Sequence, residues 1–270
     1  MELNKIYNED CLTFLSSVGG GVFDVVLTSP PYNTSRDSGI QKRPNNRPPE
    51  GRYLKVNGWR DNRTQQEYIN WCIVIFKELE KSLKENGVIL WNVSYGSDVT
   101  DNLENIDTMW LCIADIIRNT DFVVADRIIW KKSNCLPNNV TPNKLDRIVE
   151  DIFVFVRKSE IKTFKCNKKL TSISSIGQKY YSPIKNLIEA PNNSEVCPIN
   201  KATFSEELCI KLLNIYAPKN AVVYDPFMGT GTTAIACLEK GLSYVGTKIS
   251  KEQVEWAENR IKNFKKNSMW

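Results

Sequence analysis

The sequence contains no histidine among its 270 residues. The protein therefore lacks the side chain that most often acts as a general acid or base near neutral pH. A serine–histidine–aspartate triad and a histidine-ligated metal are both excluded. Chemistry in this chain must rely on carboxylates, hydroxyls, amides, backbone groups or a bound cofactor.

Paired cysteines and long apolar runs are also lacking. The eight cysteines are scattered without a C-x-x-C pair, which argues against a zinc site or a disulfide framework and indicates small buried side chains in a reducing compartment. No apolar run of about 18 residues occurs, and the first ten residues do not have the basic-then-apolar order of a signal peptide. We expect an intracellular protein with no membrane-spanning helix.

The residues that are present suit one sizeable α/β domain. Hydrophobic residues make up 41% of the chain, which is enough for one core with a small appendage. Short apolar runs alternate with amphipathic stretches, so we expect a mostly parallel sheet covered by helices on both faces. The net charge of +5 permits a nucleic-acid partner without demonstrating one.

The hydrophobic pattern predicts secondary structure along the chain. Strands are expected at 22–28, 88–93, 122–130, 152–156, 221–224 and 244–247, and helices at 64–85, 104–118, 204–216, 231–240 and 251–265. Residues 34–63 are polar and rich in proline and arginine, which indicates a long loop. We divide the chain into residues 1–156 with this loop, a small insertion at 157–196, and residues 197–270.

A glycine-rich motif follows the expected strand at 221–224. It runs from Asp225 to Thr233, reads DPFMGTGTT and leads into the expected helix. Glycines at such a turn let a ligand approach the backbone, and the first N–H groups of the helix are free to donate. The motif is not the G-x-G-x-x-G dinucleotide fingerprint and lacks the lysine of a P-loop, which disfavours phosphate binding. Alone, it also fits a tight turn capped by Asp225.

A second motif, from Thr28 to Asn33, reads TSPPYN and ends the expected strand at 22–28. The two prolines fix the backbone and so hold the Pro30 carbonyl group in place, while the Ser29 hydroxyl offers a second acceptor. Tyr32 offers a flat face. These parts suit the binding of a planar base and its exocyclic amino group. A proline turn with a packed aromatic residue would give the same pattern.

Together, the two motifs resemble the signature blocks of amino-group DNA methyltransferases. The SPPY block precedes the FxGxG block, an order similar to that of the circularly permuted β group of restriction–modification type. The similarity extends to residues 8–11, 129–132, 150–155 and 201–204. The resemblance implies a doubly wound, mostly parallel Rossmann-like sheet with a small target-recognition insertion. It also implies S-adenosyl-L-methionine, bound across the carboxyl ends of the strands, and no metal.

The resemblance assigns cofactor-binding residues as well. Asp10 would accept from the adenine amine, Asp225 would face the methionine amino group, and the glycine-rich turn would shape the pocket. The full expected set is Asp10, Cys11, Thr28, Thr203, Phe204, Asp225, Phe227, Gly229, Gly231, Thr232 and Lys248. Lys248 departs from the family, which places there a Glu or Asp that accepts from both ribose hydroxyls. Because an ammonium group can only donate, Lys248 weakens the expected cofactor affinity.

The target base is predicted from the first residue of the SPPY block. Adenine-specific relatives usually carry Asp or Asn there, whereas cytosine-N4 enzymes usually carry Ser, so Ser29 favours N4 of cytosine over the alternative, the adenine amino group. Carbon-5 methylation is excluded because the chain has no Pro-Cys pair. The expected mechanism is direct transfer to a flipped base that stacks on Tyr32 and donates from its amine to Ser29 and Pro30. The catalytic set is Ser29, Pro30, Pro31 and Tyr32.

Two basic segments are expected to hold double-stranded DNA. The loop 34–63 contributes Arg43, Arg47 and Arg52. The segment 157–185, at the position of the family's target-recognition region, carries Arg157, Lys158, Lys162, Lys165, Lys168, Lys169, Lys179 and Lys185. Either segment alone could instead be a solvated basic surface.

The resemblance extends to partners and location. It implies a cognate restriction endonuclease, a DNA-associated place in a bacterial cytoplasm, and a monomer or a homodimer. A DNA-binding relative that has lost its cofactor is the competing hypothesis, at which Lys248 hints. RNA and protein-glutamine methylation are disfavoured because related enzymes carry N-P-P-Y where this chain has Ser29.

Overall fold

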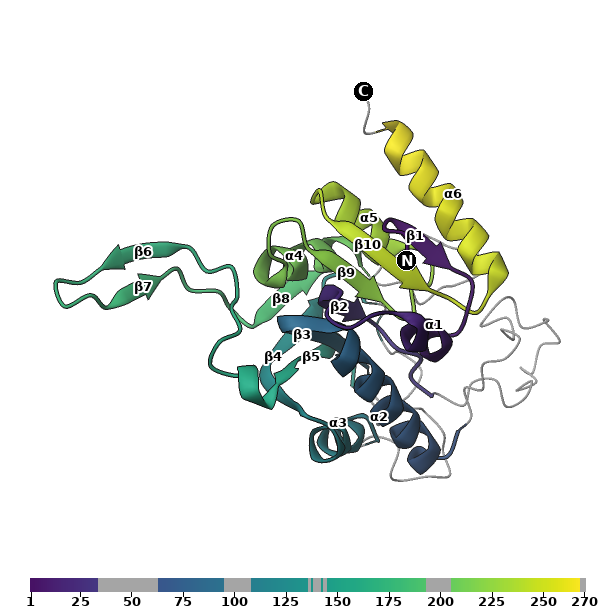
Figure 1. The fold of residues 1–270 in the computed structure, drawn as a ribbon, viewed down its shortest axis with the longest axis horizontal. Helices are drawn as coiled ribbons and strands as arrows, with labels where there is room; N and C mark the ends of the chain where they lie inside the picture. The colour runs from purple at the N-terminus through teal and green to yellow at the C-terminus, as the bar shows by residue number, and fades with distance from the viewer. Residues whose placement is uncertain are drawn as a thin grey trace.

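The computed structural model describes residues 1–33, 63–94, 108–135, 137, 142, 145–192 and 205–267 (Figure 1). Almost all of the predicted loop 34–63 lies outside the described residues, as do Thr203 and Phe204.

One eight-stranded sheet forms the centre of the molecule, in the order β1-β10-β9-β2-β3-β5-β4-β8. Only β5 runs against its neighbours β3 and β4, and the other pairs are parallel. The bounds are β1 Lys5–Tyr7, β2 Phe23–Thr28, β3 Leu83–Val93, β4 Phe122–Lys132, β5 Val149–Arg157, β8 Leu187–Ala190, β9 Val222–Asp225 and β10 Ser243–Thr247. The predicted mostly parallel sheet is confirmed.

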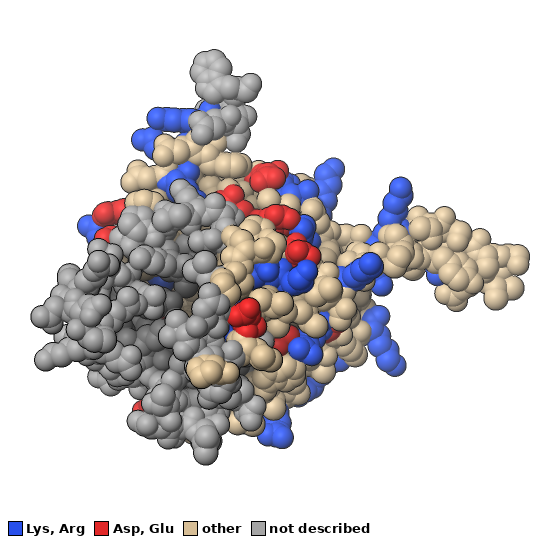
Figure 2. Space-filling model, turned by 180° about the vertical axis from the view of Figure 1, so that it is seen from behind, with Lys and Arg blue, Asp and Glu red and all other residues tan. Residues whose placement is uncertain are grey.

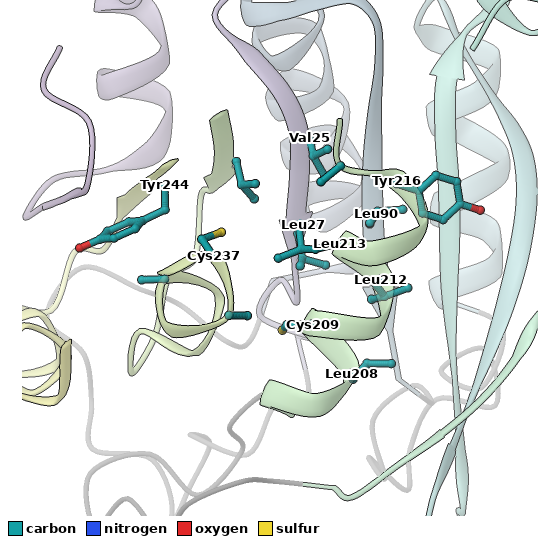
Figure 3. Close-up of a cluster of buried hydrophobic side chains, with 14 of the residues drawn as sticks. Val25, Leu27, Leu90, Leu208, Cys209, Leu212, Leu213, Tyr216, Cys237 and Tyr244 are labelled. Atoms are coloured by element: carbon teal, nitrogen blue, oxygen red, sulfur yellow. The ribbon is translucent and has the colours of Figure 1, made fainter. Parts of the chain in front are cut away.

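Helices cover both faces of this sheet. Alternation along β2 decides which residues each face buries: Val26 packs toward one set of helices, while Val25 and Leu27 pack toward the other. The first set is α1 Cys11–Ser17, α2 Gln65–Ser82 and α3 Thr108–Asn119, and the second is α4 Glu206–Tyr216, α5 Thr232–Glu239 and α6 Lys251–Asn267. Figure 3 shows apolar side chains of α4 in one cluster with Val25 and Leu27 of β2 and Leu90 of β3. The sequence missed β1, α1 and β8, because each is short.

Helix α2 starts as its sequence predicts and ends earlier. A reciprocal capping box joins Thr64 and Glu67 at its start. The expected end at residue 85 is wrong: the helix stops at Ser82, and Leu83 already pairs with Phe23 of β2. Arg157 explains the early stop, because its guanidinium donates to the carbonyl oxygens of Glu80 and Leu83 at 2.6 Å and of Lys84 at 2.9 Å.

Arg157 and Lys158 therefore serve the fold. Sequence reasoning placed both at the start of a DNA-binding segment, but the Lys158 ammonium donates to the carbonyl oxygen of Thr120 at 2.7 Å. The rest of the predicted insertion is divided. A hairpin of β6 (Leu170–Ile173) and β7 (Lys179–Tyr181) projects from the body (Figure 1), whereas β8 pairs with β4 in the main sheet. The division of the chain at 156 and 196 stays a prediction.

The first testable prediction concerns this helix end. We expect Arg157→Lys to lower the free energy of unfolding by about 1–3 kcal/mol, because a lysine cannot supply the guanidinium fork that satisfies three carbonyl groups. Chemical denaturation followed by far-ultraviolet circular dichroism measures the loss. Lys162→Met is the matched control, since Lys162 is exposed and forms no ion pair among the described residues. Equal stability of the two variants would contradict the capping role of Arg157.

Within the described ranges, no helix is both long and apolar enough to cross a membrane, and no group of three or more cysteines and acidic side chains could hold a metal ion. The seven cysteines described are all free thiols.

Candidate active site

The two sequence motifs lie side by side at one edge of the sheet. The SPPY block follows β2 and the glycine-rich turn follows β9, and these strands are parallel neighbours paired at Val25–Val223 and Val26–Tyr224. From β2 the chain continues through α2 to β3 on one side, and from β9 through α5 to β10 on the other. In open α/β sheets a ligand binds in the crevice where the connections diverge in this way. The candidate site is therefore the carboxyl end of β2 and β9.

A buried carboxylate joins the two motifs. Asp225 accepts from the Thr28 hydroxyl at 2.6 Å, from the Phe227 backbone N–H at 2.9 Å and from the Thr233 hydroxyl at 2.7 Å. Burial raises the pKa of the Asp225 carboxyl, and the bonds from Thr28 and Thr233 oppose that rise. The sequence predicts that Thr28 and Asp225 contact the cofactor directly. Thr28 is fully buried and Asp225 almost so, and their observed contacts fix the turn.

The glycine-rich turn has the backbone that its sequence requires. Gly229 and Gly231 have positive φ angles of 55° and 85°, a region that L side chains disfavour. A Cβ on Gly231 would also lie 3.1 Å from the Cβ of Ala257 in α6. Arg260, on the same helix, donates to the Thr230 carbonyl and the Thr232 hydroxyl at 3.1 Å. The turn is thus anchored from α6, and the expected contact of Thr232 with the cofactor stays a prediction.

The acidic turn after β1 reaches the same edge. Strand β1 pairs with β10, and the Asn8 side chain donates to the carbonyl oxygens of Lys248 and Ile249 at 2.9 Å. Asp10 caps α1 by accepting from the Leu12 N–H at 2.9 Å, and its partly exposed carboxylate keeps acceptor capacity for a ligand. Cys11 is buried, which raises the pKa of its thiol to about 12, with the Asp10 charge adding to the rise.

Lys248 lies between this turn and β9. Burial lowers the pKa of its ammonium group, and the Asp225 charge opposes that shift. No carboxylate of the described chain pairs with it within 4 Å. The edge therefore brings together the glycine-rich turn, the Asp10 acceptor and the Lys248 cation. The glycine-rich turn and Asp10 fit S-adenosylmethionine, whereas Lys248 would offer a ribose a donor in place of two acceptors.

The SPPY block is held by its own side chains. The Pro31 carbonyl accepts from the Tyr68 hydroxyl at 2.8 Å, whereas the Pro30 carbonyl accepts no hydrogen bond from the described residues. The Ser29 and Tyr32 hydroxyl oxygens are 2.5 Å apart. Burial raises the pKa of the Tyr32 phenol, as does the charge of Glu150, so Tyr32 keeps its proton at neutral pH. Of the two prolines, only Pro31 has its carbonyl occupied by a described side chain, so a contact of Pro30 with the substrate stays a prediction.

Three residues that the sequence reasoning missed complete this site. The Asn92 amide nitrogen, at the end of β3, lies 2.6 Å from the Tyr32 hydroxyl and 2.7 Å from Glu150 Oε2. Lys132 of β4 pairs with Glu150 Oε1 at 2.5 Å, and both side chains are nearly buried. The available signal was a polar residue within an apolar strand, as in Trp91-Asn92-Val93.

The expected DNA contacts are only partly placed. Arg43, Arg47 and Arg52 lie outside the described residues. Lys165, Lys168 and Lys169 are exposed on the segment that leads into β6. Figure 2 shows basic side chains gathered near the base of the projecting hairpin, whose tip carries no charge. These lysines are free to meet a phosphate backbone.

Comparison with known proteins agrees with this geometry. The sequence profile of a family described as DNA methylase matches residues 23–259. The chain is 28% identical to the type II methyltransferase M.BglII of Bacillus subtilis, over 94% of this chain and 68% of that protein. It is 24% identical to the type II methyltransferase M.HinfI of Haemophilus influenzae, over 98% of this chain and 70% of that protein.

Solved structures share the fold. The PvuII DNA methyltransferase, described as cytosine-N4-specific, aligns with a TM-score of 0.69 at 18% identity, over 94% of this chain and 84% of that chain. The TTHA0409 protein of Thermus thermophilus, described as a putative DNA modification methylase in complex with S-adenosyl-L-methionine, aligns with a TM-score of 0.63 at 16% identity, over 96% of this chain and 93% of that chain.

Proposed function

Because this chain belongs to the DNA methylase family and uses S-adenosyl-L-methionine, we propose that it methylates N4 of cytosine in duplex DNA. One observation carries the proposal: Thr28, directly before the SPPY block, is hydrogen-bonded to Asp225 of the glycine-rich turn at 2.6 Å. A base bound at the first motif and a cofactor bound at the second would therefore meet in one crevice.

The residues on the cofactor side bind and orient. S-adenosylmethionine supplies a methyl group on a sulfonium centre. The turn at Gly229 and Gly231 would receive its methionine end, Asp10 would accept from the adenine amine, and Lys248 would lie against the ribose. Phe227 is partly exposed and packs against Trp71 with ring centroids 5.4 Å apart, so it can form an apolar wall of the pocket.

The residues on the base side hold a flipped nucleotide. The Tyr32 ring would stack on the base, and the Pro30 carbonyl would accept from its exocyclic amine and so direct the nitrogen lone pair toward the methyl group. Transfer would form the N–C bond as the S–C bond of the sulfonium breaks, and the amine would lose a proton to solvent. Positioning and electrostatics would supply most of the rate enhancement, because the described residues offer no strong base beside the amine.

Analysis of modified nucleosides tests the target base. The chain is expressed in cells without other amino-group methylation, and their digested DNA is analysed by mass spectrometry. We expect N4-methylcytosine. N6-methyladenine would overturn the choice of base and keep the reaction type. Unmodified DNA, together with no cofactor binding in calorimetry, would favour a DNA-binding relative that has lost its cofactor.

DNA binding gives a separate prediction. We expect the triple variant Lys165→Glu, Lys168→Glu and Lys169→Glu to bind duplex DNA about tenfold more weakly at moderate salt, and the slope of log affinity against log salt to flatten by about 3, since each phosphate contact contributes about 0.9. Fluorescence anisotropy over a salt series measures both quantities.

The control reverses the charge of three lysines on α6, with Lys251→Glu, Lys262→Glu and Lys265→Glu. This control has the same net charge as the first triple variant. If both triple variants had the parent's salt slope, Lys165, Lys168 and Lys169 would be a solvated surface only.

A further inference from the structure

A chain of hydrogen bonds runs behind the SPPY block from Lys132 through Glu150, Asn92 and Tyr32 to Ser29. Lys132, at one end, determines which group donates at each step. Lys132 has only donors, so Glu150 Oε1 accepts from it at 2.5 Å. The second oxygen of this carboxylate faces Asn92 at 2.7 Å and also accepts. An ionised carboxylate cannot donate, so Asn92 must present its amide nitrogen to Glu150.

The oxygen of the Asn92 amide shows how strongly this orientation is imposed. Asn92 is 1% exposed, and its Oδ1 is buried without a hydrogen-bond partner among the described residues. A buried acceptor without a partner is costly. Rotating the amide would place Oδ1 against the Glu150 carboxylate, which is worse, so the donor orientation is kept.

The Asn92 amide nitrogen also determines where the hydroxyl protons of Tyr32 and Ser29 point. It lies 2.6 Å from the Tyr32 hydroxyl oxygen, which therefore accepts and must donate its own proton elsewhere. The Ser29 hydroxyl is 2.5 Å away and Glu150 is 3.4 Å away, so the proton points to Ser29. Both amide hydrogens of Asn92 are used by Glu150 and Tyr32, so the 3.4 Å contact between Asn92 and Ser29 Oγ adds no further donor to Ser29. Because Ser29 accepts from Tyr32, its own proton is free to be donated to a substrate.

We infer that the chain Lys132–Glu150–Asn92–Tyr32 makes Ser29 a hydrogen-bond donor toward the substrate, and that its acceptor is the ring nitrogen beside the exocyclic amine of the target base. The sequence led us to expect Ser29 to accept from the amine; here its proton is directed at the ring nitrogen, and the Pro30 carbonyl accepts from the amine. Cytosine offers such an acceptor at N3, next to N4. Glu150 and Asn92 are positioning residues, since they act through Tyr32 and Ser29.

The inference rests on the proposed function, and base analogues separate the two. The substrate is a duplex containing the methylated site, identified by sequencing DNA from cells that express the chain. In a second duplex 3-deazacytosine replaces the target cytosine, so that N3 becomes a C–H group (1-deazaadenine serves if the target is adenine). For each protein we compare kcat/KM on the natural duplex with kcat/KM on the analogue duplex. We expect this ratio to be about tenfold larger for the parent protein than for Ser29→Ala. Dividing the parent's ratio by that of Ser29→Ala cancels the difference in intrinsic reactivity between the two bases.

Glu150→Gln tests the relay itself. The oxygen of the substituted amide must accept from Lys132, so its nitrogen faces Asn92, which then presents Oδ1 to both the new amide and Tyr32. Tyr32 would donate to Asn92 and Ser29 to Tyr32, leaving lone pairs at Ser29 for the substrate. We expect Glu150→Gln to lose the preference for the natural base over the deaza base as Ser29→Ala does, and thermal melting confirms that the variant is folded.

Glu189→Gln is the matched control. It breaks the exposed ion pair at 3.1 Å between Glu189 and Lys131, the residue that precedes Lys132 on β4. Its preference for the natural base should equal that of the parent. If Ser29→Ala or Glu150→Gln keeps the parent's preference while the parent methylates natural duplex, the inference is overturned and the proposed function stands. If the parent methylates no duplex, both are overturned.

Discussion

Replacing Tyr32 by alanine is expected to lower kcat for DNA methylation by about 10²-fold, because stacking on a base contributes about 1–3 kcal/mol and the hydroxyl bond to Ser29 is lost as well. The affinity for S-adenosylmethionine should change by less than about threefold, since Tyr32 lies on the β2 side of the crevice and the cofactor residues lie at β9, β10 and the turn after β1. Single-turnover rates with labelled cofactor measure the first quantity, and calorimetry the second.

Tyr32→Phe separates the ring from the hydroxyl. The phenylalanine ring keeps the stacking face, while the 2.5 Å contact with Ser29 and the 2.6 Å contact with Asn92 disappear. We expect a rate within about tenfold of the parent, together with loss of the preference for the natural base over its deaza analogue. If Tyr32→Ala instead turned over at the parent's rate, Tyr32 would have no part in stacking.

The sequence predicted the architecture well because the central elements carry strong periodic signals. The run at residues 152–156 is apolar throughout and the run at residues 22–27 is interrupted only by Asp24, which is typical of strands buried on both faces, and both proved to be central strands. The end of α2 was misplaced because the stop depends on Arg157, 75 residues after Ser82 in the chain. A contact of that kind leaves no local pattern to find.

The site was predicted as two motifs and not as a network. Ser29 and Tyr32 are close in sequence, so their common role could be inferred. Asn92, Glu150 and Lys132 meet only because β3, β5 and β4 are neighbours in the sheet. Pairing across β5 is antiparallel, whereas βαβ reasoning favours parallel neighbours, and so nothing local placed Glu150 beside Asn92.

The departure at residue 248 leads to the last prediction. Lys248→Glu should bind S-adenosylmethionine about 10- to 100-fold more tightly, because a carboxylate can accept from both ribose hydroxyls and a hydrogen bond to a charged group is worth about 1.5–3 kcal/mol. The backbone at this position is already set: the Lys248 N–H donates to the Tyr7 carbonyl at 3.0 Å, and Asn8 holds the Lys248 carbonyl at 2.9 Å. A glutamate at position 248 would therefore extend from the same backbone position as the lysine.

The charge of Lys248 must be separated from its missing acceptors. Its ammonium interacts with the buried Asp225 carboxylate, so its removal raises the pKa of Asp225 further, and a second carboxylate does so more strongly. Lys248→Met removes the cation without adding an acceptor and is expected to bind the cofactor no more tightly than the parent, because it loses the ammonium donor and gains no acceptor. Calorimetric titration of the three proteins, with thermal melting to confirm folding, gives the comparison. Equal or weaker binding by Lys248→Glu than by Lys248→Met would mean that the ribose does not lie at the end of β10.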